Sequence, residues 1–269
     1  MMTGLTLLQA LALATTAGSG TDMADLLSGT FSNEEQVYFE KDAGRSAPPW
    51  LSLRISADEN GLILTPVDAF GKASGAEQPV TISEGTNRTS LHVGKCSRFF
   101  ERSGDGWTFA AVQNRMACRQ DYQIIAITPD ALTLRLPDGA ETLLKRARAV
   151  ECWAAVPKTE PKADGSTDWL FARKLSLHDQ GGRAMVGGGD SGAEAVTLRM
   201  RAVHWPPTSS NRPSMVLYVH KDDPDRAASY SWADIDASRV GINLRWMQAS
   251  CTIVGAKRAS QVDRDNSRG

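Results

Sequence analysis

Short runs in which apolar and polar residues alternate occupy most of the chain. In 51–55, apolar side chains alternate with Ser and Arg, and the same alternation recurs over 132–136, 196–202 and 240–246. In a strand, this pattern places one row of side chains on a core and the other row in solvent. The pattern predicts antiparallel β-structure.

Turn-forming residues separate these runs at intervals of about eight to twelve residues, as in β-barrels and β-sandwiches. The segment 103–106 (Ser-Gly-Asp-Gly) predicts a hairpin. A single helix is expected over 21–28, capped by Thr21 or Asp22 and ended by Gly29. Further strands are expected over 61–67, 79–83, 90–93, 97–102, 107–112, 122–128, 141–156, 169–178 and 215–220.

The punctuation of the chain predicts two domains. We expect an all-β fold in which an antiparallel β-barrel domain (21–156) precedes a smaller antiparallel β domain (168–255). The polar, Pro-containing segment 157–167 is expected to link them, and 256–269 is expected to be a disordered tail.

The first twenty residues differ from the rest of the chain. An apolar run over 5–14 has the length of a signal-peptide core and is followed by small residues, although no Lys or Arg precedes it. We expect residues 1–20 to be a signal peptide and the mature chain to be periplasmic or secreted. The alternative is a short buried helix. No other stretch is apolar enough to predict an integral membrane segment in the mature chain.

Four cysteines, an even number, suit an oxidising compartment. Cys96 and Cys118 flank the predicted hairpin and are expected to pair across it, which leaves Cys152 with Cys251 to tie the two halves together. The other connectivities, and four buried thiols, remain open. The chain has 30 Lys and Arg against 31 Asp and Glu, and this balance argues against a nucleic-acid partner.

No catalytic centre is recognisable, so the catalytic residues are unknown. Residues 189–192 spell Gly-Asp-Ser-Gly, the tetrapeptide around the nucleophile of trypsin-like proteases, but they lie in a glycine run that predicts a turn. None of the four histidines has the spacing of a metal site, so no metal is expected. His204 is expected in the core, and His178 at a turn.

Arginine and tryptophan crowd the second half of the chain. Guanidinium groups and flat aromatic rings recognise carboxylates, sugars and planar ligands, whereas the favoured interpretation is solvated strand faces over an aromatic core. The residues are Arg183, Arg199, Arg201, Arg212, Arg226, Arg239 and Arg245, with Trp169, Trp205, Trp232 and Trp246.

The first half resembles the CpcT/CpeT family of phycobiliprotein chromophore lyases. The matching residues are Gly29, Phe31, Asn33 and Gln36 in a G-x-F-x-N-x-x-Q segment, together with the strand 96–102 that opens with Cys96. The resemblance covers residues 24 to 156. It implies a lipocalin-like calyx that holds an open-chain tetrapyrrole and delivers it to a cysteine of an acceptor protein.

Three functions are therefore expected in turn. The first is an exported calyx that binds a small apolar or tetrapyrrole-like ligand and needs no cofactor. The second is a chromophore lyase with a protein acceptor, the one enzymatic possibility. The third is a non-enzymatic structural or interaction protein of the cell envelope. The calyx would place these residues in or at the mouth of its pocket: Phe31, Asn33, Gln36, Arg98 and Glu101.

Overall fold

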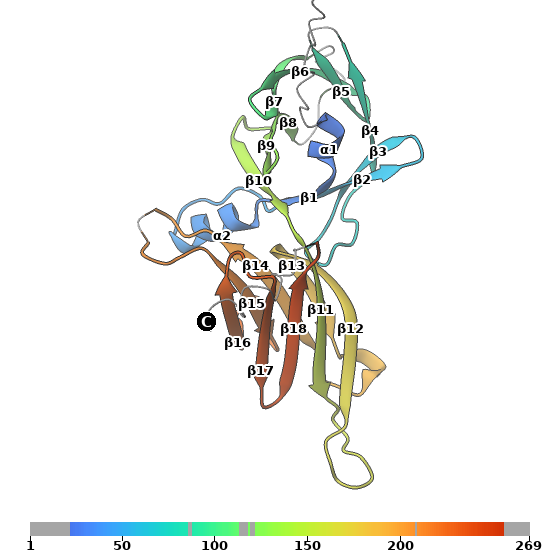
Figure 1. Ribbon diagram of the computed structural model, residues 1–269, viewed down its shortest axis with the longest axis vertical. Helices are drawn as coiled ribbons and strands as arrows, with labels where there is room; N and C mark the ends of the chain where they lie inside the picture. Colours follow the sequence, from blue (N-terminus) through green and yellow to red (C-terminus); the bar gives the residue numbers. More distant parts are fainter. Residues whose placement is uncertain (1–21, 86–87, 113–117, 119–121, 208, 256–269) are drawn as a thin grey trace, which may run out of the picture.

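The computed structural model describes residues 22–85, 88–112, 118, 122–207 and 209–255. The chain is all-β, as expected, and forms a closed ten-stranded antiparallel barrel followed by a smaller body of two four-stranded antiparallel sheets (Figure 1). No helix in the described part of the chain is long and apolar enough to cross a membrane.

The barrel runs up and down in sequence order, and β1 closes it between β2 and β10. All neighbouring strands are antiparallel, and every strand expected in this half is present. The strands are β1 (Gly29–Ser32), β2 (Ser52–Asp58), β3 (Gly61–Pro66), β4 (Gln78–Glu84), β5 (Thr89–Val93), β6 (Cys96–Ser103), β7 (Gly106–Val112), β8 (Gln123–Ile127), β9 (Ala131–Arg135) and β10 (Glu141–Ala147).

Helix α1 (Met23–Leu27) lies inside the ring of strands (Figure 1). The carboxylate of Asp22 accepts a hydrogen bond from the backbone N–H of Ala24, which confirms the predicted helix and one of its two predicted caps. Met23, Leu26 and Leu27 are buried in one cluster with the inward side chains of the barrel. The helix therefore fills much of the interior.

A second helix, α2 (Glu34–Asp42), was not predicted. It lies beside the barrel where the two bodies meet (Figure 1). Its sequence carries no apolar stripe, because Val37 is its one buried apolar residue while the carboxylate-bearing Glu34 and Glu35 are also buried. Tertiary ion pairs, rather than hydrophobic periodicity, hold this helix in place.

The second body is a β-sandwich with sheet orders β12-β11-β18-β17 and β13-β14-β15-β16. The inward rows of both sheets form one apolar core. The elements are β11 (Ala149–Pro157), β12 (Trp169–His178), β13 (Gln180–Val186), η1 (Gly189–Ser191), β14 (Val196–Val203), β15 (Ser214–His220), β16 (Ser229–Asp234), β17 (Arg239–Leu244) and β18 (Met247–Ile253).

The boundary between the bodies differs from the prediction. The run 141–156, expected as one barrel strand, is divided between β10 in the barrel and β11 in the sandwich, so the chain crosses at Arg148. The segment 157–167, expected as the linker, lies almost entirely in the loop that joins β11 to β12 within the sandwich. The predicted signal peptide and tail lie outside the described residues.

Both predicted disulfides are present, Cys96–Cys118 and Cys152–Cys251. The second bond differs from the prediction in its role. Cys152 and Cys251 face each other on the adjacent strands β11 and β18, so the bond lies within one sheet of the sandwich and does not tie the two halves together.

Buried carboxylates on α2 join the barrel to the sandwich. Glu34 pairs with Arg199 and accepts a hydrogen bond from the Trp50 indole at 2.8 Å, and Arg201 approaches the same carboxylate to 3.7 Å. Glu35 bridges Lys145 of the barrel, at 2.7 Å, to the backbone N–H of His204, at 3.0 Å. Charges removed from water are stable only with such partners.

We predict that Glu34→Gln strongly destabilises the protein, because it leaves the buried guanidinium groups without their carboxylate. The free energy of unfolding should fall by about 3–5 kcal/mol in a urea titration. The control is Glu101→Gln, which removes the exposed partner of Arg88 and should cost less than about 1 kcal/mol. Equal losses in the two variants would contradict the role given to Glu34.

We also predict that the two disulfides contribute unequally. Cys152 and Cys251 are 99 positions apart, and Cys96 and Cys118 are 22 apart. In the chain-entropy account, the longer loop constrains the unfolded chain more, by about 4.7 against about 3 kcal/mol. Urea unfolding of the two Cys-to-Ala double variants measures both values, and a larger loss without Cys96–Cys118 would contradict the expectation.

Candidate binding site on the sandwich

The barrel interior is closely packed. Among the described residues, the hollow inside it measures about 10 Å³ and is lined by Leu64, Leu91, Val93, Cys96, Arg98, Tyr122 and Ile124. That volume is roughly the space needed for one water molecule, whereas pockets for ligands of tetrapyrrole size occupy several hundred Å³.

Three of the predicted ligand-binding residues make structural contacts where β1 meets α2. Phe31 is fully buried in the barrel core, with the guanidinium of Arg146 4.5 Å from its ring centroid. The Asn33 amide donates to the carbonyl of Pro49 at 2.8 Å and accepts from the N–H of Leu51 at 2.7 Å. The Gln36 side chain accepts hydrogen bonds from Thr142 and Leu143. Asn33 and Gln36 share a shallow surface depression.

The other two predicted residues lie elsewhere. Arg98 is buried in the barrel wall, donates to the carbonyl of Ile124 at 3.4 Å, and leaves its Nη2 without a partner. Burial lowers the pKa of Arg98. Glu101 is exposed and pairs with Arg88. The five residues therefore do not line one cavity in the described part of the molecule.

The sequence motifs with catalytic potential occupy structural positions. Residues 189–191 form η1, and the Ser191 hydroxyl accepts a hydrogen bond from the Ala193 N–H, as in a turn. His178 accepts from the N–H of Gln180, and burial lowers the pKa of its imidazole. His204, expected in the core, lies beyond the end of β14 and is half exposed beside Glu35. The described residues hold no group of three or more potential metal ligands.

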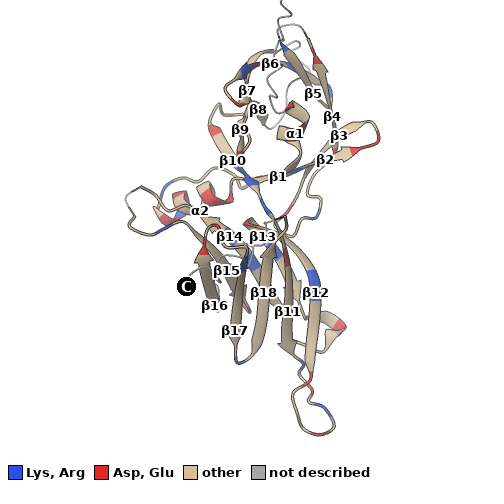
Figure 2. Ribbon diagram, viewed as in Figure 1, with Lys and Arg blue, Asp and Glu red and all other residues tan. Residues whose placement is uncertain are grey.

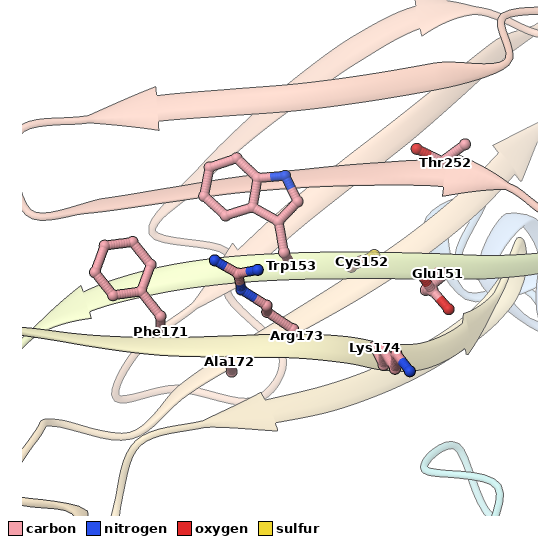
Figure 3. A pocket seen from close by; sticks show the side chains of 8 residues that line it. All are labelled: Glu151, Cys152, Trp153, Phe171, Ala172, Arg173, Lys174 and Thr252. Atoms are coloured by element: carbon pink, nitrogen blue, oxygen red, sulfur yellow. The ribbon is translucent and has the colours of Figure 1, made fainter.

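The outer face of the sheet β12-β11-β18-β17 carries large exposed aromatic side chains. Trp153 on β11 is 36% exposed and Phe171 on β12 is 61% exposed. Both rings stand out from the sheet, and the guanidinium of Arg173 lies between them (Figure 3). Alternation along β11 explains their position, because the flanking Cys152 and Ala154 point into the core.

Two open depressions flank the Trp153 ring. One has a volume of about 540 Å³ and includes Phe171 and Arg173; the other has a volume of about 480 Å³ and includes Arg239 and Asn243. The second depression follows from a row of decreasing side-chain size. Trp153 faces Ser250 on β18, and Ser250 faces Gly241 on β17. The glycine leaves the sheet surface open beside the indole.

A backbone irregularity lies beside the first depression. The pairing of β11 with β12 shifts between Cys152 and Ala154, and Lys174 on the opposite strand has a φ of 55°. Lys174 is the one non-glycine residue with positive φ in the described part of the chain. This conformation costs about 1 kcal/mol or more, and such strain is concentrated at functional sites.

Polar groups surround both depressions. Glu151, Lys174 and Thr252 line the first, and Gln248 lines the second. Arg239 is held in place by a 2.6 Å hydrogen bond from its Nε to the Ser250 hydroxyl. Basic residues colour the part of β12 that forms this face (Figure 2). The face combines flat apolar rings with fixed hydrogen-bonding groups and an excess of positive charge.

Sequence reasoning emphasised arginine and tryptophan in the second half but assigned Trp153 to a barrel strand and left out Phe171 and Arg173. The available indication was strand parity. A tryptophan that alternates with a cysteine and an alanine, and follows the polar Glu151 by two positions, lies on the solvent side of its strand.

Comparison of the chain with protein-family models, with curated proteins and with solved structures finds no match. The candidate site is therefore argued from its own geometry.

Proposed function

We propose that this chain is an exported, non-enzymatic binding protein whose sandwich binds an oligosaccharide. The observation that carries the proposal is Trp153, an exposed indole on an uncovered sheet face with an open depression on each side. The proposal develops the expectation of an envelope interaction protein and identifies the surface that would act.

The chemistry of a pyranose ring suits this surface. Its C–H bonds present an apolar face that packs on an aromatic ring, and its hydroxyl groups at the ring edge require donors and acceptors. Trp153 and Phe171 supply the rings, while Asn243 and Gln248 supply amide groups. Because depressions lie on both sides of the indole, the favoured ligand is a chain of sugars rather than a single ring.

The charges favour an acidic sugar. Arg173, Lys174 and Arg239 line the two depressions, against one carboxylate, that of Glu151. Guanidinium groups bind carboxylates through two parallel hydrogen bonds. We therefore favour oligosaccharides that contain uronic acids over neutral ones.

Export is part of the proposal. The apolar run near the N-terminus has the composition of a signal peptide, and the two disulfides suit an oxidising compartment. A polysaccharide ligand of the envelope or its surroundings would meet the protein there.

We predict that Trp153→Ala weakens binding of a galacturonate hexamer by at least about tenfold, because the stacking platform is lost. Isothermal titration of the mature chain, residues 21–269, measures the dissociation constant, with cellohexaose as the neutral ligand. The side chain is partly exposed, so the variant should retain its fold.

The matched control is Trp232→Ala, which removes a more exposed tryptophan from the other sheet of the sandwich. This variant should bind the hexamer as the parent protein does. Equal weakening by both substitutions, or binding that is unaffected by Trp153→Ala, would refute the proposed site.

A second candidate retains the barrel as a lipocalin-like binding domain for an apolar or tetrapyrrole-like ligand that carries a carboxylate. Its support is Arg98, whose buried Nη2 has no partner and whose side chain lines the small interior hollow. Such a ligand would have to displace side chains that now fill the interior. A lyase would in addition need an acceptor thiol from another protein, because all four cysteines of this chain are paired.

Absorbance titration with biliverdin and haem tests this candidate. Saturable binding that is at least about tenfold weaker in Arg98→Met would support a ligand inside the barrel. The Arg173→Met variant is the control, because Arg173 lies on the sandwich. The packing of the interior predicts the opposite outcome, no saturable binding by the folded, oxidised protein.

A further inference from the structure

Two arginines face each other on the opposite sheet of the sandwich. Arg183 on β13 is in register with Arg199 on β14, and the same row continues through Tyr218 on β15 to Tyr230 on β16. All four side chains lie on the outer face, since the intervening Leu198 and Leu217 point into the core. Like charges directly opposite each other on neighbouring strands destabilise a sheet.

Carboxylates near this row do not balance its charge. Glu34 pairs with Arg199 and lies 3.7 Å from Arg201, so one carboxylate serves two guanidinium groups. Within the described part of the chain, Arg183 has no ion-pair or hydrogen-bond partner for its side chain. Asp225 in the β15–β16 loop exerts a weaker attraction on it. Burial and the proximity of Arg199 both lower the pKa of Arg183.

Buried donors without partners cluster on the same face. The Nε of Arg199, the Nη2 of Arg201 and the Nε2 of His220 are buried and make no hydrogen bond. Arg201 and His220 are each only 2% exposed. An unpaired buried donor costs about 1–3 kcal/mol, so three on one face require an explanation.

We propose that Arg183 and Arg199 bind an oxyanion, a carboxylate, sulfate or phosphate group, on this outer face. An oxyanion between them would replace the repulsion of two like charges by charge-assisted hydrogen bonds. The adjoining exposed ring of Tyr230 would contact the rest of a larger ligand. This site lies on the sheet opposite Trp153 and does not depend on saccharide binding there.

The neighbouring charges fit a site for one anion. His220 lies beside the row, and burial lowers the pKa of its imidazole. Asp223 and Arg226 follow in the loop after β15, where the Asp223 carboxylate accepts a hydrogen bond from the backbone N–H of Arg226. Arg183 therefore remains the half-buried cation without a close counter-ion, and its substitution is the most direct test.

Titration calorimetry of the mature chain with sulfate and phosphate, at ionic strength held constant with NaCl, tests the site. We expect saturable binding that is at least about tenfold weaker in Arg183→Gln and unchanged in Arg173→Gln on the opposite sheet. Tighter binding of phenyl phosphate than of phosphate would indicate an oxyanion carried on a larger molecule, and equal affinity would indicate a free one. Absence of binding, or equal binding by Arg183→Gln, would overturn the proposal.

A second variant keeps the test independent of any loss of fold. Thr197 on β14 lies two positions from Arg199 and on the same face. Thr197→Glu would supply an internal carboxylate in place of the bound anion. We expect it to raise the melting temperature in anion-free buffer and to abolish stabilisation by sulfate. A lower melting temperature together with undiminished stabilisation by sulfate would contradict the site.

Discussion

The apolar side chains of α1 fill the barrel, and this packing determines what each body of the protein offers to a ligand. Met23, Leu26 and Leu27 occupy space that an open calyx would leave empty, so the described interior has room for about one water molecule. The sandwich packs its core between two sheets and keeps the outer face of each available. Exposed aromatic and basic residues gather on those outer faces rather than around the barrel interior.

The acidic start of α2 connects the two bodies. Two adjacent carboxylates, Glu34 and Glu35, contact Arg199 and His204 of the sandwich, while Lys145 belongs to the barrel. A second contact, from Arg148 to the fully buried Asp179, fixes the point at which the chain crosses. The junction therefore uses charge, and Arg199 takes part both in it and in the unbalanced arginine row of the outer face.

Much of the fold follows from the sequence because strand alternation and turn residues act locally. The hairpin at 103–106 and the pairing of Cys96 with Cys118 are examples. The boundary at Arg148 was missed because no Gly or Pro marks it, whereas the polar loop after β11 looks like a linker. Strand β13 was missed because it opens with glycines that suggest a turn. Parity places Trp153 toward solvent, but only the pairing of β11 with β12 and β18 brings it beside Phe171 and Gly241.

The most direct test of the account is nuclear magnetic resonance of the tryptophan indole N–H groups during titration with a galacturonate hexamer. The chain has seven tryptophans, so each one reports on its own location. The account predicts that the Trp153 resonance shifts most, while that of Trp107 in the barrel and that of Trp232 on the opposite sheet stay in place. Larger shifts at Trp107 or Trp232, or no shift at Trp153, would contradict it.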